Sequence, residues 1–149
     1  MHLDDIDRKI LNLIQHEFPV KKRPFFEIGK VIGIDENEAF YRIKRLKDRG
    51  IIRRIGPVIE RKKIGFASVL CGLHAEKDRI EKIAEFINTY PGVTHNYERD
   101  GELNLWFTIT AKTKEEIEDF LEAIENTFSL KVYRFPEKKV FKIKTYFPV

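Results

Sequence analysis

The sequence has one cysteine, Cys71, and its longest uncharged apolar stretches, such as residues 67–73, are too short to cross a bilayer. A single cysteine excludes an internal disulfide framework and a metal site built from several thiolates. The first residues, Met1 to Asp5, contain no apolar signal core. We therefore expect a cytoplasmic protein that does not bind a membrane, with the 42% hydrophobic and 35% charged residues of a folded globular chain.

Several motifs that carry chemistry are missing as well. The chain has no Gly-rich phosphate loop, no His-Glu-x-x-His, no Cys-x-x-Cys and no nucleophile elbow. These patterns would have indicated nucleotide hydrolysis, zinc chemistry or acyl transfer. Nothing in the sequence indicates a tightly bound organic cofactor.

Basic residues are concentrated in the first part of the chain. Residues 1–66 contain 16 Lys and Arg against 10 Asp and Glu, whereas residues 67–149 contain 12 against 14. A basic first half favours a polyanionic partner, either a nucleic acid or an acidic small molecule. Ordinary surface charge is the alternative explanation.

Residues 1–56 predict a winged helix-turn-helix domain. Apolar side chains recur at helical spacing over residues 3–15, and a second, short helix is expected over residues 25–32. Asp35 and Glu38 form a capping box that begins a third helix, which ends at Gly50. The strand-like residues 51–55 and 58–60 flank Gly56-Pro57 and predict a wing or a linker hairpin, so residues 57–66 are assigned to a linker strand.

Residues 67–149 predict a ferredoxin-like βαββαβ domain of the AsnC type, which makes the whole chain an α+β protein. Helices are expected over residues 79–90 and from the Thr113–Glu116 capping box to residue 128. Asp100-Gly101 is a hairpin signal. Strands are expected over residues 68–74, 93–99, 103–110, 131–135 and 140–146.

Alternation along the predicted hairpin separates the two faces of the sheet. One face is apolar and is assigned to the helices, with Leu103, Leu105, Phe107 and Ile109. The other face carries Asn104, Trp106, Thr108 and Thr110, together with Val93, His95, Tyr97 and Arg99 of the preceding strand. A helix-free face of this kind is either a dimer interface or a ligand surface. From periodicity alone, His95 is more often an ordinary hydrogen-bonded histidine.

The basic clusters have two explanations each. On the third helix, Tyr41, Lys44, Arg45 and Lys47 lie off the apolar face, where they suit either a phosphate backbone or solvent. Arg53 and Arg54 lie in a predicted strand and therefore point to opposite faces. At most one of the two arginines is then expected to serve any single pocket.

The layout resembles the Lrp/AsnC family across nearly the whole chain, and LDDIDRKILNLIQ at 3–15 and IKRLKDRGII at 43–52 are typical of it. Alone, this resemblance implies a DNA-binding transcription regulator that senses a small ligand. Three stretches are more specific: FPVKKRPFFEIGKVIG at 18–33, RIKRLKDRGIIRRIG at 42–56 and YPGVTHNYERDGELNLWFT at 90–108. They resemble the siroheme decarboxylases of the Ahb type and the related Nir proteins. Asn104 stands where ordinary regulators usually have an acidic residue.

The closer resemblance implies a carbon–carbon lyase that removes carboxyl groups from two ring acetates of siroheme. The product would be 12,18-didecarboxysiroheme, on an alternative heme biosynthesis pathway. The resemblance also implies a homologous partner subunit, in a heterodimer or a homodimer, and no sequence-specific DNA binding. No cofactor is implied beyond the iron of the siroheme substrate.

The same resemblance selects the candidate site residues. Arginine binds carboxylates bidentately, and the substrate-binding candidates are Arg23, Arg53, Arg54, Arg99, Asn104 and Trp106. His95 is the candidate acid that gives a proton to the carbon after carbon dioxide leaves, with Tyr97 as its hydrogen-bond partner or a second acid. His95 could instead ligate the siroheme iron, and the sequence leaves both roles open.

Overall fold

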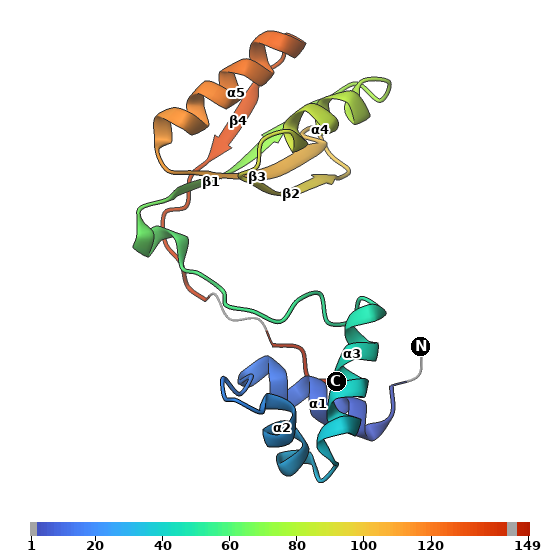
Figure 1. The fold of residues 1–149 in the computed structure, drawn as a ribbon. Helices are drawn as coiled ribbons and strands as arrows, with labels where there is room; N and C mark the ends of the chain where they lie inside the picture. Colours follow the sequence, from blue (N-terminus) through green and yellow to red (C-terminus); the bar gives the residue numbers. More distant parts are fainter. Residues whose placement is uncertain (1–2, 143–145) are drawn as a thin grey trace. The chain divides into compact units, whose positions relative to one another are not determined.

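The computed structural model describes residues 3–142 and 146–149, which divide into two units (Figure 1). One unit contains the chain up to Pro57 together with the C-terminal residues, and the other runs from Val58 to Phe141. This division differs from our expected boundaries at residues 56, 66 and 149. The last residues belong with the helices rather than with the sheet, and each unit is described by itself below.

The helical unit is built from α1 (Asp5–His16), α2 (Pro24–Ile32) and α3 (Glu36–Asp48). Asp4 caps α1 by accepting the backbone N–H of Asp7 at 2.8 Å, and Asp35 caps α3 by accepting that of Glu38 at 2.9 Å. Gly33 ends α2 with a φ of +88°, a conformation that glycine adopts without strain. The three helices confirm the expected helix-turn-helix.

The core of the helical unit is aliphatic, with one buried charge at its edge. Its buried residues are Ile10, Leu11, Ile28, Ala39, Ile43, Leu46 and Ile52. Asp7 is only 1% exposed, and its carboxylate accepts hydrogen bonds from Arg42 at 2.9 Å and Arg45 at 2.6 Å. This carboxylate therefore ties α1 to α3.

The predicted wing is not formed. Residues 51–60, all of which the structure describes, contain no strand, and a short 3₁₀ helix, η1 (Arg61–Ile64), follows them. The physical reason is the lack of a pairing partner, because Pro57 has no N–H to donate and Val58 is 87% exposed. The expected linker strand over residues 57–66 is therefore wrong.

The second unit is a four-stranded antiparallel sheet with two helices, in the expected order βαββαβ. Its strand order is β2-β3-β1-β4, the split arrangement that ferredoxin-like domains share. The elements are β1 (Ala67–Leu73), α4 (Ile80–Asn88), β2 (Val93–Glu98), β3 (Leu105–Ala111), α5 (Lys114–Phe128) and β4 (Val132–Phe135). The additional strand expected over 140–146 is absent at residues 140–142 and 146, while residues 143–145 lie outside the described part.

Helices α4 and α5 cover one face of this sheet (Figure 1). The expected apolar face is confirmed for Leu105, Phe107 and Ile109, which are at most 2% exposed in a core shared with both helices. The expectation is wrong for Leu103, which precedes β3 and lies beside Gly72 and Trp106, because the alternation of the strand does not extend to it. The neighbours of the three buried residues along β3 point to the opposite face, which carries neither helix. This open face positions the first candidate site.

Strand β2 contains a β-bulge that changes the expected pattern. Val93 pairs with Ile109 and His95 pairs with Thr108, so Thr94 is an extra residue on β2. Because of this extra residue, Val93 packs against the core while His95 lies on the open face. The expectation that Val93 shares a face with His95 is therefore wrong.

Candidate functional site

A pocket of about 290 Å³ lies on the open face of the sheet, between β2, β3 and β1. Tyr97 pairs with Trp106 and His95 with Thr108, which brings residues from two strands side by side. The lining residues are Leu70, His95, Tyr97, Arg99, Trp106, Phe107 and Thr108. Four residues selected from the sequence, three from β2 and its end and one from β3, therefore meet in one pocket.

The polar groups of this sheet-face pocket are accessible to a ligand. The Nδ1 atom of His95 lies 3.0 Å from the hydroxyl of Thr94, and among the described residues no partner bonds its Nε2. The rings of His95 and Tyr97 are 5.9 Å apart, and the guanidinium carbon of Arg99 lies 5.7 Å from the Tyr97 ring. Arg99 forms no ion pair within the described part of the chain, so its charge is available to an anion.

Trp106 lies flat against a glycine on the neighbouring strand. Its indole N–H donates to the carbonyl of Leu103 at 2.8 Å, and its ring centroid is 5.2 Å from that of Phe135. A Cβ added at Gly72 would lie only 3.1 Å from the indole ring, so the absence of a side chain there makes room for Trp106. Leu70 and Gly72 were not among the residues selected from the sequence, although alternation along β1 places both on this open face.

Asn104 has a structural position instead. Its side-chain amide donates to the carbonyl of Ala75 and its side-chain carbonyl accepts the N–H of Ala75, both at 2.8 Å. These two bonds join the residue just before β3 to Ala75, which lies two residues after the end of β1. Both polar atoms of the Asn104 side chain are thus occupied, and it does not line the sheet-face pocket.

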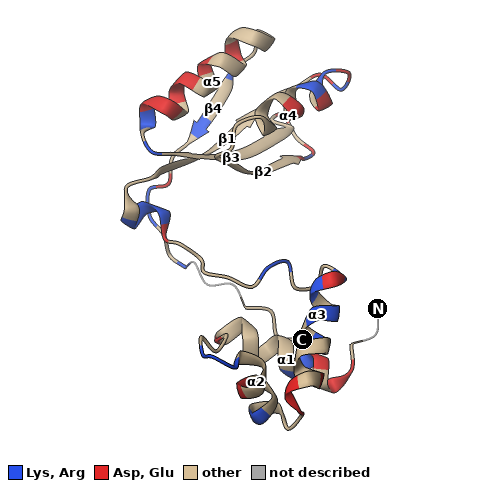
Figure 2. Ribbon diagram, viewed as in Figure 1, with Lys and Arg blue, Asp and Glu red and all other residues tan. Residues whose placement is uncertain are grey.

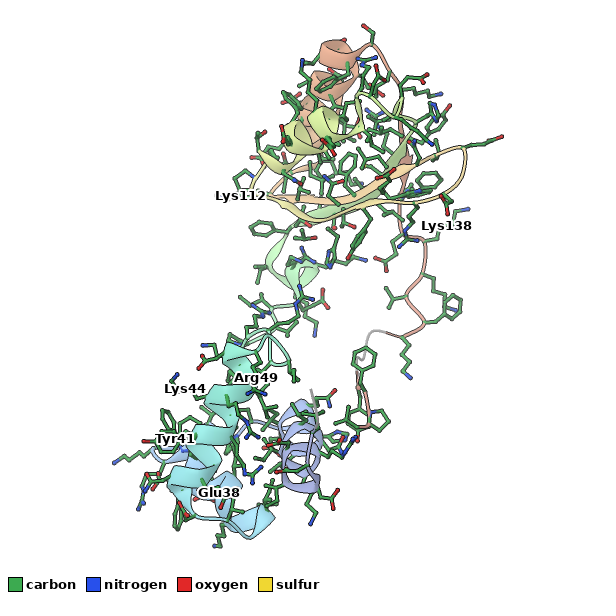
Figure 3. All side chains as sticks on the ribbon, turned by 90° about the vertical axis from the view of Figure 1, so that its right-hand side faces the viewer. Glu38, Tyr41, Lys44, Arg49, Lys112 and Lys138 are labelled. Atoms are coloured by element: carbon green, nitrogen blue, oxygen red, sulfur yellow. The ribbon has the colours of Figure 1, made fainter. Side chains whose placement is uncertain are left out.

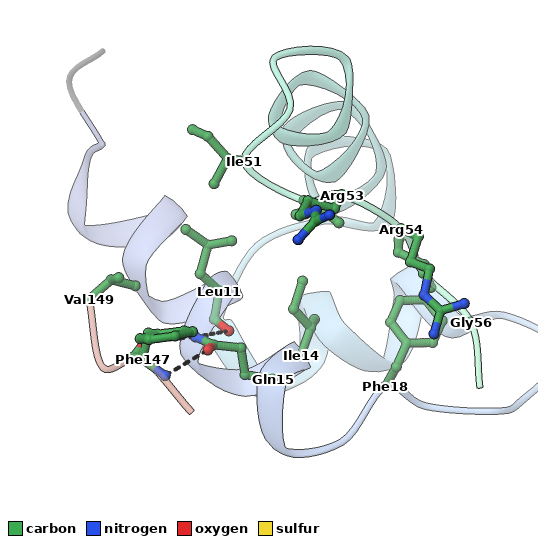
Figure 4. A pocket seen from close by; sticks show the side chains of 12 residues that line it. Leu11, Ile14, Gln15, Phe18, Ile51, Arg53, Arg54, Gly56, Phe147 and Val149 are labelled. Atoms are coloured by element: carbon green, nitrogen blue, oxygen red, sulfur yellow. Dashed lines mark hydrogen bonds between the residues drawn. The ribbon is translucent and has the colours of Figure 1, made fainter. Parts of the chain in front are cut away.

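A second pocket, of about 510 Å³, lies within the helical unit (Figure 4). Arg53 and Arg54 border it from the segment after α3, and Leu11, Ile14 and Phe18 give it an apolar wall. Arg54 donates to the carbonyl of Pro57 at 3.2 Å. The expectation that at most one of the two arginines serves a single pocket is wrong, because the segment is not a strand and both line this one.

The C-terminal residues form another part of this helical-unit pocket. Gln15 donates to the carbonyl of Phe147 and accepts its N–H, both at 2.9 Å (Figure 4). Asn12 makes the same two kinds of bond with Val149, at 2.9 and 3.1 Å. Two side-chain amides one helical turn apart on α1 thus hold an extended tail. Their spacing at i and i+3 was the only sequence signal of this arrangement.

Arg23 lies away from both of these pockets. Its guanidinium is paired with Glu36 and lies 4.7 Å from the ring of Phe26. This pairing lowers the pKa of Glu36 below its ordinary value, because the guanidinium favours the charged carboxylate. Arg23 borders a separate hollow between α2 and the start of α3.

The cations of α3 are mostly paired within the protein. Arg42 binds Asp4 and Glu38 as well as Asp7, and Lys44 lies 2.7 Å from Asp48. Figure 3 shows Tyr41, Lys44 and Arg49 along this helix. The basic helix that a phosphate backbone would contact therefore offers fewer available charges than its sequence indicates.

Neither a metal cluster nor a membrane-spanning helix is present in the described residues. No group of three His, Cys, Asp or Glu residues lies close enough together there to hold a metal ion. No described helix has the length and apolar character needed to cross a bilayer.

Comparison with known proteins agrees with the two-unit architecture. Residues 7–53 match the model of the siroheme decarboxylase NirDL-like HTH domain, and residues 63–142 match that of the AsnC-like ligand binding domain. The leucine response regulatory protein of Mycobacterium tuberculosis has the same fold, with a TM-score of 0.80 at 18% identity over 99% of this chain and all of that one. The fold therefore defines an Lrp/AsnC-like protein.

More similar sequences define the family within that class. The siroheme decarboxylase alpha subunit of Desulfovibrio desulfuricans is 38% identical over 97% of this chain and 84% of its own length. The crystal structure of the siroheme decarboxylase NirDL, in complex with an iron-uroporphyrin III analogue, matches with a TM-score of 0.72 and 31% identity over 95% of this chain. This chain spans about half of that longer NirDL chain, 47%. The chain belongs to the siroheme decarboxylase family.

Proposed function

We propose that the chain is a siroheme decarboxylase subunit, a carbon–carbon lyase that removes carboxyl groups from two ring acetates of siroheme to give 12,18-didecarboxysiroheme. The observation that carries the proposal is the meeting of His95, Tyr97, Arg99 and Trp106 in one pocket on the open face of the sheet. The cytoplasm is the proposed location. The iron belongs to the substrate, and no further cofactor is proposed.

The chemistry needs an anion-binding group and a proton donor. Arg99 would bind a carboxylate of the substrate through charge-assisted hydrogen bonds, since it has no acidic partner among the described residues. When carbon dioxide leaves, the electron pair of the broken bond stays on the ring methylene carbon and spreads into the conjugated macrocycle. A proton added to that carbon then completes a methyl group.

His95 is the proposed proton donor. Its Nδ1 is held by Thr94, which leaves Nε2 to face a substrate, and histidine exchanges protons readily near neutral pH. Tyr97 lies beside it and would orient the substrate or the imidazole through its hydroxyl. The alternative role of His95 is ligation of the siroheme iron through the same Nε2.

The other half of the open face is proposed to bind the partner subunit. Tyr133 and Phe135 of β4 are each more than 40% exposed there, and Leu70 of β1, which also borders the sheet-face pocket, is 43% exposed beside them. An apolar patch of this kind on a sheet without covering helices suits the face of a homologous sheet. Light scattering at micromolar concentration should show a dimer, either of this chain or with a homologous subunit. A stable monomer that binds no such subunit would contradict this arrangement.

Sequence-specific DNA binding is not proposed, although the chain has a helix-turn-helix unit. Arg42 and Arg45 of α3 are held by Asp7, which leaves a reduced set of cations for phosphates. A gel-shift experiment should find only weak binding that disappears steeply with added salt. Nanomolar, sequence-selective binding at physiological salt would support a regulator instead.

The deciding experiment is a direct assay. The purified chain is incubated anaerobically with siroheme, with and without a homologous partner subunit, and the tetrapyrroles are analysed by mass. We expect loss of one and then two carbon dioxide units. Unchanged siroheme in both reactions would overturn the proposed function.

A further inference from the structure

Arg61, in the short helix η1, reaches the open face of the sheet from its end. Its Nη1 donates to the hydroxyl of Thr110 at 3.0 Å, and that hydroxyl also lies 3.0 Å from the hydroxyl of Ser68. Thr110 is only 6% exposed although it lies on the face that carries no helix. Arg61 itself is exposed and forms no ion pair within residues 3–142 and 146–149.

The register of the strands places Arg61 relative to the sheet-face pocket. On β3, the open-face residues are Trp106, Thr108 and Thr110 in succession, and Thr108 is opposite His95. Successive residues on one face of a strand are about 6.6 Å apart. Because the guanidinium of Arg61 binds Thr110, it lies roughly one such step beyond Thr108, the residue opposite His95. Arg99 lies over Tyr97, on the other side of His95 along the same face. The two guanidinium groups therefore flank His95 from opposite ends of the face.

Several contacts fix the position of η1. The N–H of Phe66 donates to the carbonyl of Arg61 at 3.1 Å, which joins η1 to the start of β1. Lys62 forms an ion pair of 2.6 Å with Glu137, in the segment that follows β4. A cation held in place before the ligand arrives loses less conformational freedom when it binds.

The charges of this unit are unevenly distributed, as Figure 2 shows. Helix α5, which lies over the covered face of the sheet, carries six acidic side chains and one lysine. The short helix η1 carries three basic residues in succession. Figure 3 shows Lys138 on the segment after β4 as well. A polyanion is therefore attracted to the η1 end of the open face and repelled from the helical face.

We propose that Arg61 binds a peripheral carboxylate of siroheme that the reaction does not remove. This inference rests on the proposed function and adds a second anion contact at the end of the face opposite Arg99. A carboxylate one step away from His95 anchors the macrocycle while the acetate beside His95 reacts. Arg61 is thus a substrate-positioning group, and its contact is the same in the bound substrate and in the transition state.

The test uses the only tryptophan of the chain, Trp106, which lies on the same face. Siroheme is titrated anaerobically into wild type, Arg61→Gln, Arg61→Lys and the control Lys63→Gln, and quenching of Trp106 fluorescence gives the Kd. We expect Arg61→Gln to raise the Kd about tenfold, because one charge-assisted contact is lost, with kcat within about twofold of wild type. Arg61→Lys should recover part of the affinity, and Lys63→Gln, which removes one charge of η1 but no proposed contact, should raise the Kd far less than Arg61→Gln does.

Different failures have different meanings. If wild type binds siroheme and Arg61→Gln matches Lys63→Gln in Kd, the role of Arg61 is overturned while the proposed function stands. The same conclusion follows if Arg61→Gln lowers only the melting temperature, since a bond that merely supports Thr110 would act in that way. If wild type itself does not bind siroheme, both the proposed function and this inference fail.

Discussion

Two regions of this molecule use basic residues in opposite ways. On α3, Arg42 and Arg45 are held by the buried carboxylate of Asp7, and Lys44 is paired with Asp48. On the open face of the sheet, Arg99 and His95 have aromatic or hydroxyl neighbours and no acidic partner among the described residues. The comparison teaches that the number of basic residues in a segment does not indicate a binding surface. What matters is whether acidic groups of the same fold already neutralise them.

The largest expected effect is on the sheet face. His95→Ala should lower turnover by about 10²- to 10⁴-fold, the usual contribution of a general acid, while leaving stability unchanged because the side chain is exposed. Rate and visible spectrum are measured on the same variant. A slow reaction with a normal siroheme spectrum identifies the acid, whereas an altered spectrum identifies an iron ligand. Normal rate and normal spectrum together would remove His95 from the site, and His74 would be tested next.

On α3, by contrast, we expect a substitution to lower stability rather than turnover. Asp7→Asn should lower the free energy of unfolding of the helical unit by about 3 kcal/mol, because it leaves two arginines without their buried partner. The helical signal in circular dichroism follows the helices of both units during urea unfolding, whereas Trp106 fluorescence follows the sheet unit alone. A circular dichroism transition that moves while the Trp106 transition does not therefore reports the helical unit. Asp48→Asn, in an exposed pair, is the control and should change stability by less than about 0.5 kcal/mol. Equal effects of the two substitutions would contradict the contrast between buried and exposed pairs.

Arg53 and Arg54 test whether unpaired basic residues bind the substrate in the helical unit as well, since neither forms an ion pair among the described residues. If they bind substrate carboxylates, Arg53→Ala and Arg54→Ala should each weaken siroheme binding by roughly 1.5–3 kcal/mol without a loss of stability. Both are expected to matter, because both line one pocket. Titration of the single and double variants measures this, with Arg49→Ala as an exposed control. Negligible effects at both positions would place the substrate away from this pocket.

The smallest effect concerns the core of the sheet unit. Burial raises the pKa of the Cys71 thiol to about 12, whereas the unfolded chain ionises near its ordinary value of 9.0. A raised pKa stabilises the fold below pH 9, and this stability is lost as the pH rises toward 12. The difference in unfolding free energy between wild type and Cys71→Ala should therefore shrink by about 1.4 kcal/mol from pH 7 to pH 10. A pH-independent difference would show that the thiol is accessible to water.

The sequence predicted what local geometry determines. The caps at Asp35 and Thr113 begin α3 and α5 as expected, because an N-cap needs only residues within one turn. Alternation along β3 separated the buried Phe107 from Trp106 on the open face. Alternation along β2 likewise placed His95 and Tyr97 on one face, since residues two apart on a strand point to the same side.

Features that depend on a distant partner were not predictable in this way. The bulge at Thr94 depends on how β3 pairs with β2, and the strand-like residues 51–55 found no strand to pair with. Asn104 was selected for a ligand, but both of its polar atoms bond Ala75, 29 residues away. The pairing of Arg45 with Asp7, across 38 residues, likewise has no local signal.

The bulge in β2 also affects the tendency of the protein to aggregate at high concentration. Strands β2 and β4 are the two edges of the sheet, and a regular exposed edge is a template on which other chains can add strands and aggregate. Thr94 interrupts the hydrogen-bonding row of β2, and β4 has only four residues before Pro136 ends its supply of N–H donors. Both edges are therefore poor templates for fibrils. Growth of the sheet into a fibre is discouraged at the same time as the bulge turns His95 toward the open face.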